Sequence, residues 1–136
     1  GEDMLIQRRA AAKYHCGGLW ANACCTHPNW GEDLAHSARR RVREELGAAF
    51  PLSPRAIIEY EAKVAPDMRE HERVQIFRAD VDRDQTRLHP DPDEVDQLRW
   101  ASVSDLKAEA RATPERFAPG FRIYLDRWDE LDLDRL

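Results

Sequence analysis

The sequence has no long apolar run, and this absence excludes one large class of proteins. No stretch approaches the roughly 18 consecutive apolar residues that a membrane-spanning helix needs, and charged residues make up 35% of the chain. Internal repeats and low-complexity linkers are also absent, so we expect a single domain over residues 1–136. The hydrophobic fraction of 42% is too high for a disordered tail. The composition indicates one small globular unit without a membrane segment.

The chain also lacks an excess of basic residues and a disulfide pattern. Its formal net charge is -5 at pH 7, which argues against a nucleic-acid partner, because such surfaces need basic patches to neutralise phosphates. The cysteines number three, and Cys24 and Cys25 are neighbours whose side chains would leave opposite faces of a strand. Free thiols and the lack of a cleavable signal favour a cytoplasmic location. Because the chain starts at Gly1 just before an expected strand, we expect that an N-terminal segment precedes it.

Hydrophobic periodicity predicts a mixed sheet covered by helices. Alternating or continuous apolar patterns predict strands at residues 4–9, 19–25, 56–64, 71–79 and 95–101. Apolar residues at four-residue spacing predict a helix over 33–46, which Gly47 would end. Further helices are expected from Ser102, a capping residue, and over 119–131. Strands and helices in this order indicate an α/β or α+β sandwich.

The helix expected over 33–46 carries an unusual order of charges. In "ARRRVREELG", Arg41 precedes Glu45 by four residues, whereas a helix gains more when Glu precedes its basic partner. Both residues lie beside the apolar stripe. Two interpretations stay open from the helix alone: a solvated charged face, or a site where Arg41 contacts an anion and Glu45 a metal ion.

The segment "THPNWGEDLAHSARRRVREELGA" resembles the Nudix box, G-x5-E-x7-R-E-U-x-E-E-x-G-U. The matching positions are Glu32, Arg40, Val42, Glu44, Glu45, Gly47 and Ala48. Thr26 and Arg41 depart from the box, where it has Gly and Glu. The resemblance implies a Nudix-like mixed β-sheet sandwiched between helices. Hydrolytic Nudix enzymes use clustered carboxylates to hold metals, so an arginine among them favours binding a diphosphate over hydrolysing it.

The flanking segments narrow the resemblance to the type I isopentenyl-diphosphate isomerases. The pattern W-x-N-x-x-C-x-H-P falls on Trp20, Asn22, Cys25, His27 and Pro28, after the basic residues Arg8, Arg9 and Lys13. An E-x-E pair, Glu70 and Glu72, follows Tyr60, and "PDEVDQLRWASVSDL" and "TPERFAP" extend the similarity. Several motifs in one order make chance agreement improbable. The family's activity interconverts isopentenyl and dimethylallyl diphosphate, a step of isoprenoid biosynthesis.

The resemblance assigns catalytic roles on two faces of the substrate. Shifting the double bond requires protonation of an alkene and loss of another proton from a carbocation. Cys25 would act on one face, as a thiol of modest pKa can, with Glu72 and Tyr60 on the other. Trp20 is the candidate aromatic face for the cation, although a core aromatic is an equal interpretation. Gly120 stands where the family has a tryptophan.

The resemblance also implies two metal sites and a diphosphate site. His27, Glu70 and Glu72 would hold a divalent metal, Mn²⁺, Zn²⁺ or Mg²⁺, through imidazole and carboxylate ligands. The family adds two histidines from a segment upstream. The diphosphate would be bound by Arg9, Lys13 and Arg41, and Glu45 would hold a Mg²⁺ that bridges phosphate oxygens.

Three classes of function therefore compete. The first is an isomerase whose partner is a small prenyl diphosphate and which works as a monomer. The second is a Nudix pyrophosphohydrolase acting on a nucleotide or related diphosphate, which the Glu44 and Glu45 pair favours and Arg41 disfavours. The third is a remnant without catalysis that binds prenyl diphosphates or partners, which the expected loss of an N-terminal segment and Gly120 favour.

Overall fold

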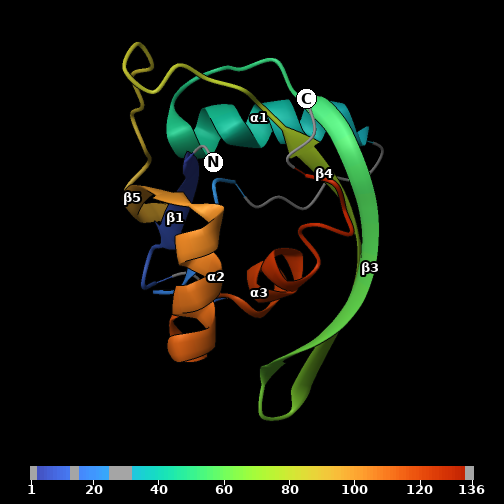
Figure 1. The fold of residues 1–136 in the computed structure, drawn as a ribbon. Coiled ribbons are helices and arrows are strands. Elements are labelled where there is room, and N and C mark those ends of the chain that lie inside the picture. The colour runs from blue at the N-terminus through green and yellow to red at the C-terminus, as the bar shows by residue number, and fades with distance from the viewer. Residues whose placement is uncertain (1–2, 13–15, 25–31, 134–136) are drawn as a thin grey trace.

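Strands and helices follow one another in the order that the sequence predicted (Figure 1). This computed structural model describes residues 3–12, 16–24 and 32–133, without the side chains of residues 64, 65 and 70. The elements are β1 (Asp3–Arg9), β2 (Trp20–Asn22), α1 (Leu34–Leu46), β3 (Ser53–Ala65), β4 (Met68–Arg78), β5 (Val95–Ser102), α2 (Val103–Ala112), a 3-10 turn (Pro114–Arg116) and α3 (Pro119–Asp126). The expected combination of helices and sheet is confirmed.

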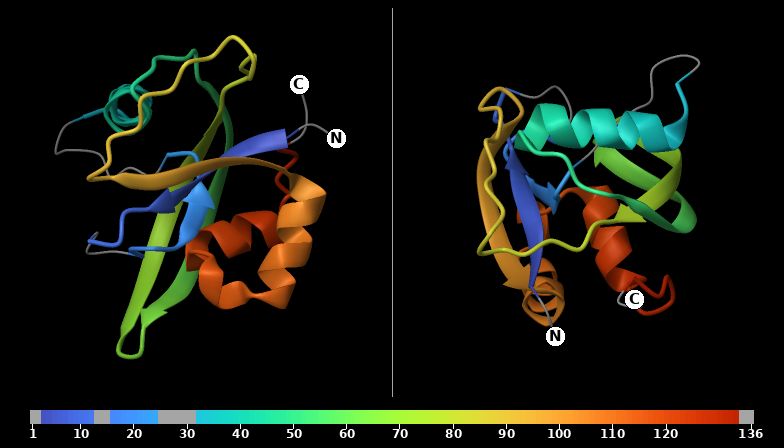
Figure 2. Two further views of the ribbon diagram at one scale, coloured as in Figure 1. Left: turned by 90° about the vertical axis from the view of Figure 1, so that its left-hand side faces the viewer. Right: turned by 90° about the horizontal axis from the view of Figure 1, so that it is seen from above.

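The strands form two sheets, with helices on both sides. One sheet has the order β2-β1-β5, and the other is the β3-β4 hairpin. All of these pairings are antiparallel; the parallel contact in the described chain is an isolated bridge between Trp20 and Phe117. Helix α1 lies on one side of the strands, and α2 and α3 lie on the other (Figures 1 and 2). The sandwich was predicted correctly, but its sheet is divided.

Four elements differ clearly in length from the prediction, and backbone pairing explains three of the differences. The hairpin pairs from Ser53 with Arg78 to Ala65 with Met68, so β3 starts before residue 56 and β4 before residue 71. Strand β2 is shorter than predicted, because its pairing with β1 ends at Asn22. Helix α3 ends at Asp126, and hydrogen-bonded turns replace the expected helix up to residue 131.

Helix α1 has defined ends and a buried face. Asp33 caps its start by accepting hydrogen bonds from the amides of Ala35 and His36, and Gly47 ends it at φ 69°. A side chain at Gly47 would also strike the backbone of His89. The buried residues of the helix are Ser37, Ala38, Val42, Glu45 and Leu46, whereas Leu34 is 50% exposed. A glutamate in this buried face marks the helix as more than a packing element.

The main core lies between the three-stranded sheet and helices α2 and α3. Its buried members are Ile6, Ala21, Ala101, Leu106, Phe117, Ala118, Phe121 and Leu125. They come from β1, β2, β5, α2, the turn before α3 and α3 itself. One face of β1 and β2 packs on this core. Their other face is directed toward α1, where the candidate site lies.

Candidate functional site

A cavity of ≈ 730 Å³ lies among β1, α1, the β3-β4 hairpin and α3. A volume of this size suits a small ligand. Four of the predicted site residues line it: Arg9, Arg41, Tyr60 and Glu72. The structure thus brings together side chains predicted to bind the diphosphate and side chains predicted to move protons, from segments far apart in the chain.

Glu45 is a buried carboxylate with a donor on each oxygen. The residue is 1% exposed. Its Oε1 accepts a hydrogen bond from Gln7 Nε2 at 3.1 Å, and its Oε2 accepts one from Cys24 Sγ at 3.1 Å. Arg41 Nη2 lies 3.4 Å from the same Oε2. A buried carboxylate is costly unless it is paired, and these contacts supply the pairing.

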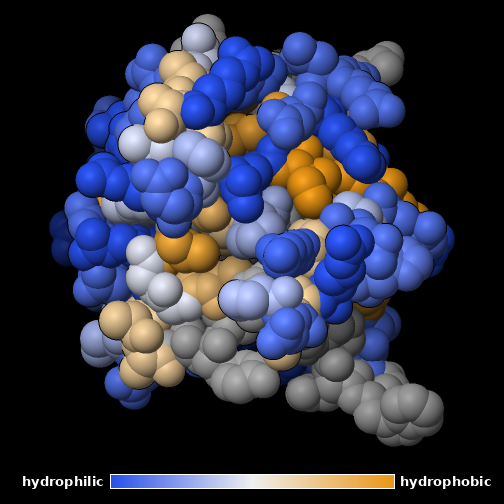
Figure 3. Space-filling view, turned by 90° about the horizontal axis from the view of Figure 1, so that it is seen from below, coloured by the Kyte–Doolittle hydropathy of each residue, from blue (hydrophilic) through white to orange (hydrophobic). Residues whose placement is uncertain are grey.

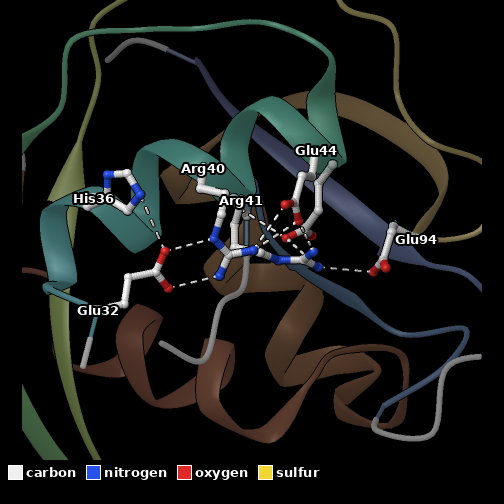
Figure 4. Close-up of polar contacts among 8 residues, drawn as sticks. Glu32, His36, Arg40, Arg41, Glu44 and Glu94 are labelled. Carbon is white, nitrogen blue, oxygen red and sulfur yellow. Dashed lines mark hydrogen bonds and ion pairs between the residues drawn. The ribbon is translucent and has the colours of Figure 1, made fainter. Parts of the chain in front are cut away.

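Arg41 is held by three carboxylates from two parts of the chain (Figure 4). It donates to Glu44 Oε2 at 2.5 Å and to Glu94 Oε2 at 3.2 Å, in addition to its contact with Glu45. Partial burial lowers its pKa, but the hydrogen bond to Glu44 and the charges of Glu45 and Glu94 outweigh this and raise it. The side chains of Arg41 and Glu45 are 20% and 2% exposed, so a solvated charged face does not describe this pair.

Arg40 joins the loop before α1 to the helix. Its Nε and Nη2 donate to the two oxygens of Glu32 at 2.8 and 3.0 Å, and its Nη1 donates to Glu44 Oε1 at 3.0 Å (Figure 4). His36 Nε2 lies 3.6 Å from Glu32. Hydrogen bonds to Glu32 and Glu44 raise the pKa of Arg40, and those from Arg40 and Arg41 lower the pKa of Glu44. Arg40 therefore organises the helix start, while Arg41 is directed to Glu45.

Tyr60 and Glu72 face each other across the β3-β4 hairpin, and both line the cavity. The Tyr60 ring meets Tyr124 of α3 edge to face, with centroids 5.9 Å apart. A Cβ added at Gly120 would lie 2.6 Å from Tyr60 Oη. The Tyr60 hydroxyl therefore lies where a side chain at residue 120 would begin.

Arg9 and Trp20 take different positions relative to the cavity. Arg9 lines it at the end of β1, and its amide donates to the carbonyl of Leu19 at 2.9 Å. Trp20 is absent from the lining that the described residues form, and its ring instead packs on the core and lies 5.8 Å from the Arg8 guanidinium. The described structure thus places Trp20 against the core, and its role beside the cation stays a prediction.

Several predicted site residues lie outside the described part of the chain. They are Lys13, Cys25 and His27, together with the side chain of Glu70. Within the described residues, no group of three or more His, Cys, Asp or Glu side chains is arranged to hold a metal. Of the predicted ligands His27, Glu70 and Glu72, the structure describes the side chain of Glu72 alone, so this metal site stays a prediction.

Sequence reasoning missed two residues at the site, Gln7 and Cys24. The sequence placed Cys24 on the strand face opposite to Cys25 and gave it no role, but its thiol contacts Glu45 and the residue lines the cavity. Gln7 is 0% exposed in the middle of β1. A glutamine between Ile6 and Arg8 in a buried strand was the available signal, since buried amides need specific partners.

Comparisons with known proteins agree with this geometry. Residues 1–121 match the family model described as the NUDIX domain. The chain is 52% identical over 126 residues to an isopentenyl-diphosphate Delta-isomerase of Cereibacter sphaeroides, covering 92% of this chain and 71% of that protein. It is 51% identical to the enzyme of the same name from Ruegeria pomeroyi, covering 90% of this chain and 68% of that protein.

Solved structures support the fold independently. A MutT protein from Methanosarcina mazei superposes with a TM-score of 0.71 at 17% identity, over 96% of this chain and 85% of that one. A MutT Nudix hydrolase from Burkholderia pseudomallei gives 0.67 at 21% identity, over 92% and 87%. These identities bear on the fold alone. Together with the family match and the relatives at about half identity, they lead to one conclusion: the chain belongs to the Nudix domain family and, within it, to the isopentenyl-diphosphate Delta-isomerases.

Proposed function

We propose that this protein is an isopentenyl-diphosphate Delta-isomerase that interconverts isopentenyl and dimethylallyl diphosphate. The observation that carries the proposal is the composition of the cavity, which Arg9 and Arg41 line together with the cross-strand pair Tyr60 and Glu72. Cations suit the diphosphate, and a phenol beside a carboxylate suits proton transfer at carbon. The 52% identity to the Cereibacter sphaeroides enzyme supports the same reaction.

The reaction needs an acid, a base and a site that excludes water. A proton is added to the terminal carbon of the alkene, which leaves a tertiary carbocation. A different proton is then lost from the chain carbon on the other side of the cationic centre. Cys25 serves one face of the substrate, and Glu72 with Tyr60 serves the other. Water would quench the cation, so the apolar parts of the cavity contribute by excluding it.

The diphosphate is held by Arg9, Lys13 and Arg41, with Glu45 as the carboxylate for Mg²⁺. Family membership implies dependence on a divalent metal. Glu45 fits Mg²⁺ in chemistry, because Mg²⁺ takes oxygen ligands and is commonly bound by one or two carboxylates plus substrate phosphates. When bound there, Mg²⁺ would neutralise charge on the phosphate oxygens. A second divalent metal, Mn²⁺, Zn²⁺ or Mg²⁺, would be held by His27, Glu70 and Glu72.

The contacts of Arg41 weigh against the pyrophosphohydrolase alternative. A hydrolytic Nudix site needs carboxylates free to bind metals and activate water. Here Arg41 and Arg40 both donate hydrogen bonds to Glu44, so this carboxylate is paired within the protein and Glu45 is the one left for Mg²⁺. The carboxylate cluster is therefore partly neutralised by the protein itself, which suits retention of the diphosphate.

The test follows two products in one sample. The protein is incubated with isopentenyl diphosphate and Mg²⁺ in D₂O, and deuterium in the prenyl chain is measured alongside released phosphate. We expect deuterium incorporation without phosphate release, and loss of incorporation in Cys25→Ala. Rapid phosphate release from nucleoside diphosphate derivatives, without exchange into the prenyl chain, would instead identify a hydrolase. Binding without either product would identify a protein that has lost catalysis.

A further inference from the structure

We propose that Gln7 is a positioning residue for Glu45: it holds one carboxylate oxygen so that the other is presented to Mg²⁺ and diphosphate in the cavity. The inference rests on the proposed function, because it deepens the role given there to Glu45. It concerns a residue that touches neither the substrate nor the metal and acts through the carboxylate beside it.

Gln7 connects three elements at one buried point. It is 0% exposed, and Glu45 is 1% exposed. Its side-chain Nε2 donates to Glu45 Oε1 at 3.1 Å and to the carbonyl oxygen of Ala23 at 2.7 Å. A single amide group on β1 therefore fixes the last turn of α1 relative to the chain that follows β2.

The carbonyl oxygen of the Gln7 side chain indicates that this residue does more than fill space in the core. Gln7 Oε1 is buried and has no hydrogen-bond partner within the described chain. An unpaired buried carbonyl is unfavourable, and an apolar side chain of the same size would avoid it. The amide is therefore explained by what its nitrogen does, which is to donate to Glu45 and Ala23.

The contacts of Glu45 divide its two oxygens between the protein and the cavity. Oε2 is in contact with Cys24 and Arg41, and both of those residues line the cavity. Gln7 and Glu45 are not among the lining residues that the structure describes. Oε2 is thus the oxygen nearer the cavity, and Oε1 is the one that Gln7 restrains. Residues that hydrogen-bond a metal ligand in this way orient it, and their loss weakens metal binding.

The experiment compares Gln7→Met with Gln75→Met in the full chain. Gln75 is the control, because it is another strand glutamine whose Nε2 donates two hydrogen bonds, in its case to the backbone carbonyls of Ala56 and Ile76, both at 3.0 Å, and not to Glu45. Mg²⁺ is titrated into each protein in the presence of inorganic pyrophosphate and followed by calorimetry. We expect Gln7→Met to weaken the Mg²⁺ affinity about tenfold or more, while Gln75→Met stays at the parent value. Pyrophosphate binding without Mg²⁺ should be the same in all three proteins.

Glu45→Gln in the same titration separates this inference from the proposed function. If Glu45→Gln leaves Mg²⁺ binding unchanged, the metal role proposed for Glu45 is wrong. If Glu45→Gln weakens it and Gln7→Met matches the parent, the role of Gln7 is overturned. Gln7→Asn is the second variant, since it keeps an amide in β1 but is too short to reach Glu45, and it should show the same defect. Unfolding of both Gln7 variants, with Gln75→Met folded, would make Gln7 a structural residue and also overturn the inference.

Discussion

At the scale of single residues, Gly120 is a position where the lack of a side chain has a direct structural effect. Its Cβ position lies 2.6 Å from Tyr60 Oη and 3.3 Å from Tyr60 Cζ. The distance to Oη is shorter than real Cβ contacts, so the Tyr60 hydroxyl would have to move if residue 120 had a side chain. The distance to Cζ would require a shift of only a few tenths of an ångström. The hydroxyl of Tyr60 can approach the backbone of residue 120 this closely because that residue has no side chain.

Gly120→Ala should therefore lower turnover by displacing the Tyr60 hydroxyl. We expect kcat to fall about tenfold or more with a smaller change in KM, because small displacements of catalytic groups cost rate rather than binding. The control is the same change in a Tyr60→Phe background, where the hydroxyl is missing and the substitution should have little further effect. An equal fall in both backgrounds would show that Gly120 acts independently of Tyr60.

Arg41 gives a second prediction at this scale. Arg41→Ala should weaken binding of inorganic pyrophosphate about tenfold or more, because charge-assisted hydrogen bonds contribute roughly 1.5–3 kcal/mol each. Arg41→Glu should weaken it further by repelling the anion, and we expect it to admit trace phosphate release. Equilibrium titration measures the affinity, with Arg39→Ala as the control because Arg39 is exposed on the same helix. Equal losses in Arg39→Ala and Arg41→Ala would point to a general charge effect.

At the scale of elements, local signals predicted the helices better than the hairpin. Asp33 and Gly47 define the ends of α1 within the helix itself. The lengths of β3 and β4 depend on their pairing with each other, which apolar patterns do not contain. The site shows the same limit. Gln7 and Cys24 contact Glu45 from 38 and 21 residues away in the sequence, and Glu94 contacts Arg41 from 53 residues away. Arg41 and Glu45 could be identified because they share one helix, whereas their more distant partners could not.

The charge network of α1 should make the stability of the protein depend on pH. Arg40 and Arg41 lower the pKa of Glu44 below its ordinary value of 4.5. The contribution of ionised Glu44 to the stability of the folded state is therefore complete above pH 4.5. It is lost as the pH falls through the lower pKa that Glu44 has in the folded state. Urea unfolding in metal-free buffer should show Glu44→Gln less stable than the parent at pH 7, with the difference shrinking in acid. Glu61→Gln, at an exposed position on β3, is the control. A difference that is constant from pH 7 to pH 3 would contradict this account.

At the scale of the whole molecule, the described chain exposes few large apolar side chains. Figure 3 shows one face, on which hydrophobic patches are bordered by hydrophilic side chains. The large exposed hydrophobic residues in the described chain are Leu34, Ile57 and Met68, which belong to α1, β3 and β4. No helix in the described chain is long and apolar enough to cross a bilayer. Scattered exposed apolar residues are usual on monomers.

We therefore predict that the protein is a monomer in solution. Sedimentation velocity over a range of micromolar concentrations should give one species with the mass of a single chain. A species of twice that mass whose fraction rises with concentration would contradict the prediction. Ile57→Lys then serves as a probe, because a dimer that uses the exposed face of β3 would dissociate when a charge is placed there.

The end of α1 is closed by a segment from elsewhere in the chain, and this affects how the site exchanges with solvent. The amides of His89 and Asp91 donate to the carbonyls of Leu46 and Glu45 at 2.8 and 3.0 Å, and the amides of Glu94 and Val95 donate to Asp91. The loop that carries Glu94 is thus hydrogen-bonded to the last turn of α1. Under hydrogen-deuterium exchange, the amides of His89, Asp91, Glu94 and Val95 should open together with the last turn of α1 as one cooperative unit. The guanidinium of Arg41 and the carboxylate of Glu45 would then keep their relative geometry through every fluctuation smaller than the opening of that unit.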